Sequence, residues 1–156
     1  MHIGCPKEIK PQEFRVGLTP NAAHEAVNHG HTVTVETNAG IGAGFTDDDY
    51  TAVGAQIAGT AAEVFAAADM IVKVKEPQPV ERKMLREGQI LFTYLHLAPD
   101  PAQTKDLMES GATCIAYETV TDDRGGLPLL APMSEVAGRL APQVGAWTLQ
   151  KANGGR

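Results

Sequence analysis

Three side chains that can carry positive charge stand at or just after predicted strands: Arg15, Lys75 and His96. Lys75 ends the run 71–75 and His96 ends the run 91–96, while Arg15 lies in a polar loop after the first predicted strand. In open α/β sheets, ligands bind outside the carboxyl ends of the strands. We therefore expect these groups to converge at one sheet edge and to form a pocket for a small carboxylate, which arginine recognises well.

A purely structural interpretation of the same three residues is also open. Lys75 is followed by Glu76, and Arg15 stands two positions after Glu13, so each cation has a carboxylate within reach. His96 would then be a strand-end histidine with satisfied hydrogen bonds. Spacing alone does not separate a substrate pocket from a set of local ion pairs.

The elements that would position these residues alternate between short apolar runs and helical segments. The clearest helix has Thr19 as its N-cap, Pro20 at its first position and Gly30 after its end. Another is expected after Thr46, where aspartates suit the positive helix end. The alternation predicts an α/β fold, a Rossmann-like parallel sheet with flanking helices. The predicted strands cover residues 2–8, 32–36, 70–75, 89–96 and 112–118, and further helices cover 61–68, 80–87 and 100–110.

From Met133 onward, apolar residues keep helical spacing and predict one long amphipathic helix. Pro142 cannot donate a helical backbone hydrogen bond and crowds the preceding turn, so we expect a kink or break there. Residues 151–156 resemble a helix exit into a further segment. We expect residues 1–128 to form one domain and residues 129–156 to form a helix that connects it to a missing domain.

Residues 40–44 read Gly-Ile-Gly-Ala-Gly, and they follow a predicted strand and precede a helix, as a phosphate-binding turn would. A dinucleotide fingerprint needs a third glycine at its sixth position, where Phe45 stands, and an acidic residue after the next strand. The stretch is therefore expected to be a loop whose glycines allow positive φ.

No metal site is expected. His24, His29 and His31 lack the i, i+4 spacing of helical zinc ligands and lie around a helix end. Residues 47–49 are contiguous aspartates, whereas a calcium loop alternates its ligands around a glycine. Both groups are expected to be structural.

Composition narrows the classes of protein and partner. The 156 residues suit one domain or two small ones, and 43% hydrophobic with 21% charged residues are typical of a globular protein. The net charge of -6 argues against nucleic acid and anionic lipid as partners.

No apolar run approaches the ~20 residues of a membrane span, and the charged start lacks an export signal. Cys5 and Cys114 fit reduced thiols, so a cytoplasmic protein is expected.

Six ordered motifs across the chain resemble the amino-terminal region of the alanine dehydrogenase and pyridine nucleotide transhydrogenase family. Lys-Glu-Pro followed by Tyr-Leu-His is similar to the alanine dehydrogenase branch, since transhydrogenases generally lack that histidine. The motifs are Ile-Gly-Cys-Pro-Lys-Glu at 3–8, Glu-Phe-Arg-Val at 13–16 with Leu-Thr-Pro at 18–20, Gly-Ile-Gly-Ala-Gly-Phe-Thr-Asp at 40–47, Val-Lys-Val-Lys-Glu-Pro at 72–77, Tyr-Leu-His-Leu-Ala at 94–98 and Pro-Met-Ser-Glu-Val-Ala-Gly at 132–138.

The resemblance implies NAD-dependent oxidative deamination of L-alanine to pyruvate and ammonium, and the reverse reaction. It implies that Arg15 and Lys75 bind the substrate, that His96 gives and takes the proton, and that Ser134 contacts NAD. The family's nucleotide-binding domain would lie beyond this chain, so the fragment alone is expected to be inactive. Family members are typically hexamers, so a homo-oligomer is implied as well.

Two other functions stay open at this point. One is the nucleotide-binding subunit of an NAD(P) transhydrogenase, which would need no alanine pocket. The other is a non-catalytic module that binds pyruvate or alanine. Continuation of the gene into a glycine-rich strand, turn and helix would separate the enzyme from the module.

Overall fold

The structure is a computed structural model that describes residues 1–155. These residues divide into two compact units, Met1–Ala116 and a second unit that begins at Tyr117. The second unit contains α6 (Ala131–Leu149) and two short 3-10 helices, η2 (Tyr117–Thr119) and η3 (Lys151–Asn153). The first unit contains strands β1 (His2–Cys5), β2 (Thr32–Glu36), β3 (Gln56–Ala58), β4 (Met70–Val72), β5 (Ile90–Thr93) and β6 (Thr113–Ala116), helices α1 (Pro20–Asn28), α2 (Asp47–Thr51), α3 (Ala61–Ala67), α4 (Pro79–Arg82) and α5 (Pro101–Ser110), and the 3-10 helix η1 (Ile41–Ala43).

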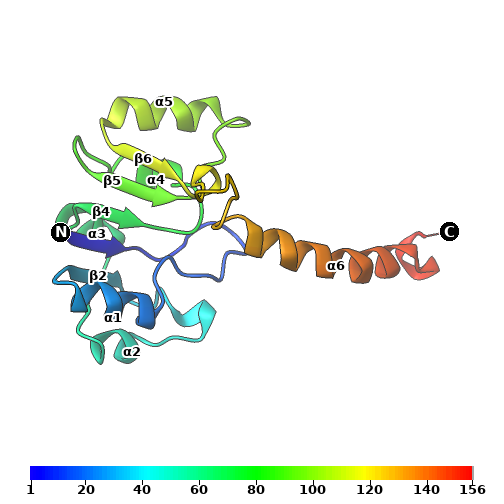
Figure 1. Ribbon diagram of the computed structural model, residues 1–156, viewed down its shortest axis with the longest axis horizontal. Coiled ribbons are helices and arrows are strands. Elements are labelled where there is room, and N and C mark those ends of the chain that lie inside the picture. Colours follow the sequence, from blue (N-terminus) through cyan, green and yellow to red (C-terminus); the bar gives the residue numbers. More distant parts are fainter. Residues whose placement is uncertain (156) are drawn as a thin grey trace. The chain divides into compact units, whose positions relative to one another are not determined.

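All six strands form one parallel sheet in the order β3-β2-β1-β4-β5-β6, which confirms the predicted fold class (Figure 1). The strand order reverses at β1, so the chain leaves β1 and β4 in opposite directions along the sheet. In such sheets this point opens a crevice outside the carboxyl ends of the two strands. The loops that follow β1 and β4 are therefore the places where the fold favours a ligand site.

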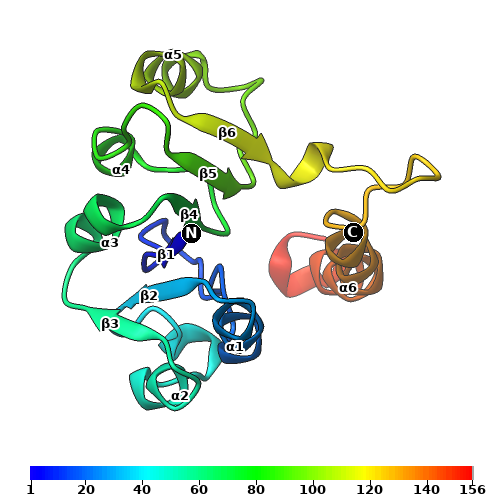
Figure 2. The ribbon, with the colours of Figure 1, turned by 60° about the vertical axis from the view of Figure 1, so that its left-hand side comes forward.

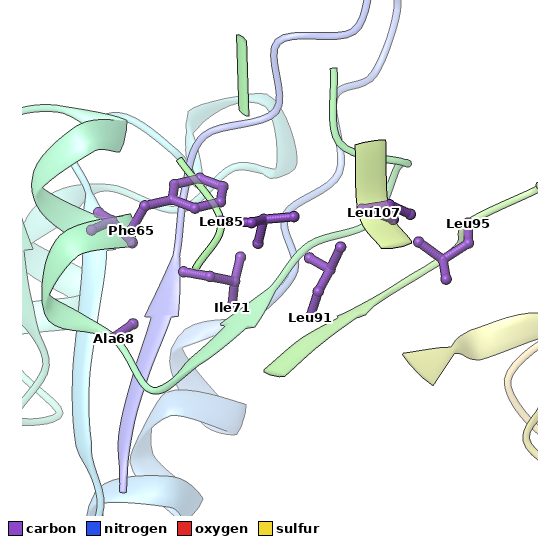
Figure 3. Packing of buried hydrophobic residues seen from close by; sticks show 8 residues of the cluster. Phe65, Ala68, Ile71, Leu85, Leu91, Leu95 and Leu107 are labelled. Carbon is purple, nitrogen blue, oxygen red and sulfur yellow. The ribbon is translucent and has the colours of Figure 1, made fainter. Parts of the chain in front are cut away.

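Two apolar clusters lie on the two faces of the sheet. Helices α3, α4 and α5 cover one face, and α1 and α2 cover the other (Figure 2). The first cluster contains Val64, Phe65, Ala68, Ile71, Leu85, Leu91, Leu95 and Leu107 (Figure 3). The second contains Cys5, Ala23, Val33, Val35, Ala39, Tyr50 and Ala55. Consecutive residues of β2 and β4 are buried, whereas β5 and β6 alternate between more and less buried positions, so one face of these two strands is less covered.

Threonine side chains start three of the helices. Thr19 Oγ1 accepts a hydrogen bond from the backbone N–H of Ala22 at 3.3 Å, as its N-cap position predicts. Thr46 and Thr60 each form a capping box with the acidic residue three positions later. Asp47, Asp48 and Asp49 stand in the first turn of α2, where carboxylates stabilise the positive helix end.

Most predicted strands are longer than the observed ones. The first was expected to reach residue 8 but ends at Cys5, because Pro6 has no N–H to continue the ladder. The strand expected over 70–75 is β4, which ends at Val72, and the strand expected over 89–96 is β5, which ends at Thr93. The residues that follow, up to 75 and 96, belong to loops. The strand expected over 112–118 covers only Thr113–Ala116.

Three other features differ from the sequence prediction. The short edge strand β3 was not predicted, because three residues carry too little periodicity to be recognised. The helix expected over 80–87 is only Pro79–Arg82, after which hydrogen bonds to the third residue back replace helical ones. A kink or break was expected at Pro142, and a break is excluded because α6 continues through this residue.

The two thiols are expected to differ in reactivity. Cys5 is fully buried, and burial raises the pKa of its thiol to about 11, whereas Cys114 is partly exposed. Because the thiolate is the reactive form, a thiol-specific reagent at pH 8 should modify Cys5 at least about tenfold more slowly than Cys114. Mass spectrometry of the labelled chain measures both rates, and urea provides the unfolded control. Equal rates in the folded chain would contradict this burial of Cys5.

Candidate functional site

The three predicted cations all lie beyond the carboxyl ends of neighbouring parallel strands. Arg15 is exposed in the loop after β1, Lys75 is half-buried three residues after β4, and His96 is exposed three residues after β5. These strands end at the same sheet edge (Figure 1). Ser134 is exposed on α6 in the second unit.

Two glycines allow the loop of Arg15 to take its path. A Cβ atom at Gly17 would lie 2.5 Å from the carbonyl oxygen of Val72, so this loop runs directly against the end of β4. A Cβ atom at Gly42 would lie 2.6 Å from the carbonyl oxygen of Phe14. The glycine-rich stretch 40–44 therefore supports the loop of Arg15 by close backbone packing.

Arg15 is held by a carboxylate from its own loop. Its Nε and Nη2 donate to Glu13 Oε1 and Oε2 at 2.8 and 2.6 Å, and its backbone N–H donates to the same Oε1 at 2.9 Å. Hydrogen bonds from Arg15 hold the pKa of Glu13 below its usual range, and the charge of Lys75 adds to this effect. The local ion pair that sequence spacing allowed for Arg15 is therefore present.

Glu76 does not form the ion pair with Lys75 that the sequence spacing allowed, because its partner is Lys10. Lys10 lies in the loop after β1. This contact links the loop of Arg15 to the segment that follows β4.

A cavity of about 460 Å³ adjoins Arg15. Charged side chains of Lys7, Glu8, Glu13 and Arg15 line it together with the loop after β2. Its volume suits a small ligand. Lys75 and His96 do not line this cavity, so it includes only one of the three predicted site residues.

A buried lysine connects three elements beneath the site. Lys73 is 1% exposed, and its Nζ lies 2.7 Å from Glu81 Oε1 in α4 and 3.3 Å from Glu8 Oε2 in the loop after β1. Glu8 Oε1 accepts the backbone N–H of Val74 at 2.7 Å. Burial raises the pKa of Glu8, although the charge of Lys73 opposes that effect. Two carboxylates therefore share one ammonium group with little solvent.

The sequence prediction missed Glu8, Lys73 and Glu81. A usable signal was present, because Lys73 stands inside the apolar run 71–75 of a sheet that helices were expected to cover on both faces. A lysine in that setting is almost never buried without a charged partner. The partner itself could not be identified, since Glu8 is 65 residues away in sequence.

The backbone at His96 is in the left-handed region, with φ of 48°. This conformation is uncommon for residues other than glycine, and surrounding contacts must maintain it. The fully buried Gln103 contributes one, because its Nε2 donates to the carbonyl oxygen of Leu95 at 2.6 Å. The turn that carries His96 is thereby fixed to α5.

Glu13 should make stability sensitive to acid. Because the folded state lowers the pKa of this carboxyl, the ionised form contributes stability above its unfolded pKa of about 4.3, and that contribution is lost as the pH falls through the folded pKa. Glu13→Gln should therefore unfold with a weaker pH dependence between about pH 5 and pH 2. Urea denaturation across this range measures the difference, and parallel pH profiles for parent and variant would contradict it.

The described residues contain neither a metal-binding cluster nor a helix that could span a membrane. Within residues 1–155, no three histidine, cysteine or acidic side chains lie close enough together to hold a metal ion. No helix in the same part of the chain has the length and apolar character needed to cross a membrane.

Comparison with known proteins shows the family of the chain. The family model described as "Alanine dehydrogenase/PNT, N-terminal domain" matches residues 4–137. The chain belongs to this family. Curated alanine dehydrogenases of Halomonas elongata and Mycobacterium tuberculosis H37Rv are 57% and 55% identical to it, over 99% and 100% of the chain. In each case the chain spans about 42% of the relative's length.

Solved structures of the family show the same fold. A structure described as L-alanine dehydrogenase covers the whole chain with a TM-score of 0.92 and 54% identity, and the chain covers 43% of it. A transhydrogenase from Sinorhizobium meliloti covers 76% of the chain with a TM-score of 0.71 and 29% identity, and the chain covers 34% of it. The chain therefore corresponds to the amino-terminal domain that the two kinds of family member share.

Proposed function

We propose that this chain is the substrate-binding part of an NAD-dependent L-alanine dehydrogenase, which converts L-alanine to pyruvate and ammonium and catalyses the reverse reaction. The observation that carries the proposal is the placement of Arg15, Lys75 and His96 beyond the carboxyl ends of the neighbouring strands β1, β4 and β5, at the crevice-forming edge of the sheet. Arg15 supplies a guanidinium group oriented by Glu13, and Lys75 supplies an ammonium group after the neighbouring strand. Such a site suits a substrate with one carboxylate.

Each residue has a role that its chemistry supports. The planar guanidinium of Arg15, oriented by Glu13, binds the substrate carboxylate. The ammonium group of Lys75 polarises the carbonyl oxygen of pyruvate. His96 transfers the proton, since imidazole can give and take protons near neutral pH in a reversible reaction. The division into residues 1–128 for substrate binding and 129–156 as connector is part of the same proposal.

NAD, when bound, exchanges a hydride with the substrate. The stretch 40–44 does not fit its pyrophosphate, because Gly42 is packed against the backbone of Phe14. We propose that NAD is bound mainly by a domain absent from this chain, with Ser134 on α6 supplying one contact. On this proposal the chain alone is inactive.

The functional unit is proposed to be a homo-oligomer, a hexamer as the family resemblance implies. Exposed apolar side chains of α6, at Val136, Leu140, Val144 and Trp147, support an assembled state because they follow helical spacing. The transhydrogenase alternative is less favoured, since similarity to L-alanine dehydrogenase is greater in both identity and coverage.

Calorimetric titration of the chain with pyruvate and with NADH tests the proposal. We expect pyruvate to bind with a dissociation constant on the order of 1 mM, Arg15→Ala to weaken binding at least about tenfold, and NADH to bind more weakly than it binds a complete dehydrogenase. His29→Ala, on the surface at the end of α1, is the control variant. Absence of pyruvate binding, or tight binding of NADH, would contradict the assignment.

A further inference from the structure

The sheet leaves one side of the segment before Lys75 without a strand partner. The ladder between β1 and β4 pairs Ile3 with Met70 and Gly4 with Ile71, and β1 then ends at Cys5. Residues 73–75 keep contacts only toward β5 within this sheet: Lys73 N–H donates to Phe92, and Val74 accepts from Tyr94. Beyond the point where β1 and β4 diverge, the backbone that carries Lys75 therefore has no partner strand on the β1 side.

The carboxylate of Glu8 occupies the place of the missing partner. Its Oε1 accepts the N–H of Val74 at 2.7 Å and lies 3.4 Å from the N–H of Lys75. From the other side, the buried Thr93 Oγ1 donates to the carbonyl oxygen of Lys75 at 2.9 Å. Both polar backbone atoms of Lys75 are therefore directed at buried side chains. The position from which the ammonium group extends is set by these two contacts.

Glu8 is in turn held by Lys73, which also pairs with Glu81. Glu81 belongs to α4 and accepts the backbone N–H of Gln78 at 2.7 Å. Buried ion pairs are a weak source of stability, and apolar replacements of a complete pair or triad are often as stable or more so. The network is therefore not needed simply to fill the core. Within this network, Glu8 is the residue that accepts hydrogen bonds from the backbone of Val74 and Lys75.

We propose that Glu8 is a positioning residue for Lys75, held by its ion pair with Lys73, which Glu81 holds in turn, so that the buried triad serves substrate binding rather than stability. The proposal rests on the proposed function, in which Lys75 meets the substrate. Glu8 acts through its acceptor oxygen, because the contacts to Val74 and Lys75 need an acceptor and not a charge. Glutamine keeps an acceptor for the N–H of Val74 but loses the acceptor that faces Lys73, whereas leucine loses both.

The test compares Glu8→Gln with Glu8→Leu in the 156-residue chain, with Val33→Ala as a control that weakens the core away from the triad. The readouts are pyruvate affinity by calorimetry, the amide resonances of Val74 and Lys75 by NMR, and thermal unfolding. We expect Glu8→Leu to weaken pyruvate binding at least about tenfold and to shift both resonances. Glu8→Gln should weaken binding no more than about threefold, and Val33→Ala should lower the unfolding temperature with affinity kept.

A second variant keeps the test decisive if Glu8→Leu fails to fold. The triple variant Glu8→Leu, Lys73→Met, Glu81→Gln removes all three charges and leaves no lone buried ion, while glutamine retains the cap of α4. We expect it to fold with near-parental thermal stability and to lose pyruvate affinity at least about tenfold. If the triad had a purely structural role, the pyruvate affinity of the triple variant would equal that of the parent.

Two results overturn the inference. One is a folded Glu8→Leu or triple variant that binds pyruvate as the parent does. The other is a pair of Val74 and Lys75 resonances that do not respond to loss of the Glu8 acceptor. If the parent itself does not bind pyruvate, the proposed function fails, and the resonances still decide whether Glu8 positions Lys75.

Discussion

Replacing Lys75 or His96 by alanine is expected to lower kcat/KM for pyruvate by about 100- to 1000-fold. The setting is a chimera in which this chain replaces the matching 155 residues of the Halomonas elongata relative, called here the Halomonas chimera. Lys75 would lose the charge that polarises the carbonyl oxygen, and His96 would lose the group that transfers the proton. Both losses act on the chemical step, so kcat should fall more than KM rises.

Matched surface residues provide the controls for this prediction. Lys105 is an exposed lysine paired with Glu109 on α5, and His29 is an exposed histidine at the end of α1. Lys105→Ala and His29→Ala should change kcat/KM less than about twofold in the Halomonas chimera. A steady-state assay of NADH oxidation with pyruvate and ammonium measures all four variants. Activity of Lys75→Ala or His96→Ala equal to that of the controls would remove that residue from the site.

Lys73→Ala is expected to lower the free energy of unfolding by about 3–5 kcal/mol. The substitution leaves Glu8 and Glu81 as buried carboxylates without their shared cation. Urea denaturation measures the loss. Lys10→Ala, which breaks the more exposed ion pair with Glu76, should cost less than about 1 kcal/mol.

The loss from Lys73→Ala should also depend on pH. Burial raises the pKa of Glu8, so without Lys73 the folded state takes up a proton more readily than the unfolded state. Stability of the variant should therefore recover partly as the pH falls from 7 toward about 5. A loss as small as that of Lys10→Ala, or one that grows as the pH falls, would contradict the charged triad.

The fold could be predicted from local patterns, because strands and helices alternate along the chain and the helices pack on both sides of the sheet. Strands buried on two sides are apolar runs, and threonine caps mark the starts of α1, α2 and α3. The ends of the strands could not be predicted. They depend on where a neighbouring strand stops, as when β1 ends at Cys5 and β4 loses its partner.

The candidate site was predicted in part for the same reason. The apolar runs that precede Arg15, Lys75 and His96 were enough to predict that these residues lie after the carboxyl ends of strands. The contact of Arg15 with Glu13 is local, so spacing could suggest it. The contact of Glu8 with Lys73 joins residues that are distant in sequence, and only the sheet order brings them together.

Turnover by the parent Halomonas chimera tests the central claim most directly. The measurement is the rate of NADH oxidation with pyruvate and ammonium, with the separate halves as controls. We expect the assembled chimera to oxidise NADH only when both substrates are present, and neither half alone to do so. A chimera that folds and binds NADH yet does not oxidise it with pyruvate and ammonium would contradict the claim that this chain supplies the substrate half of an alanine dehydrogenase.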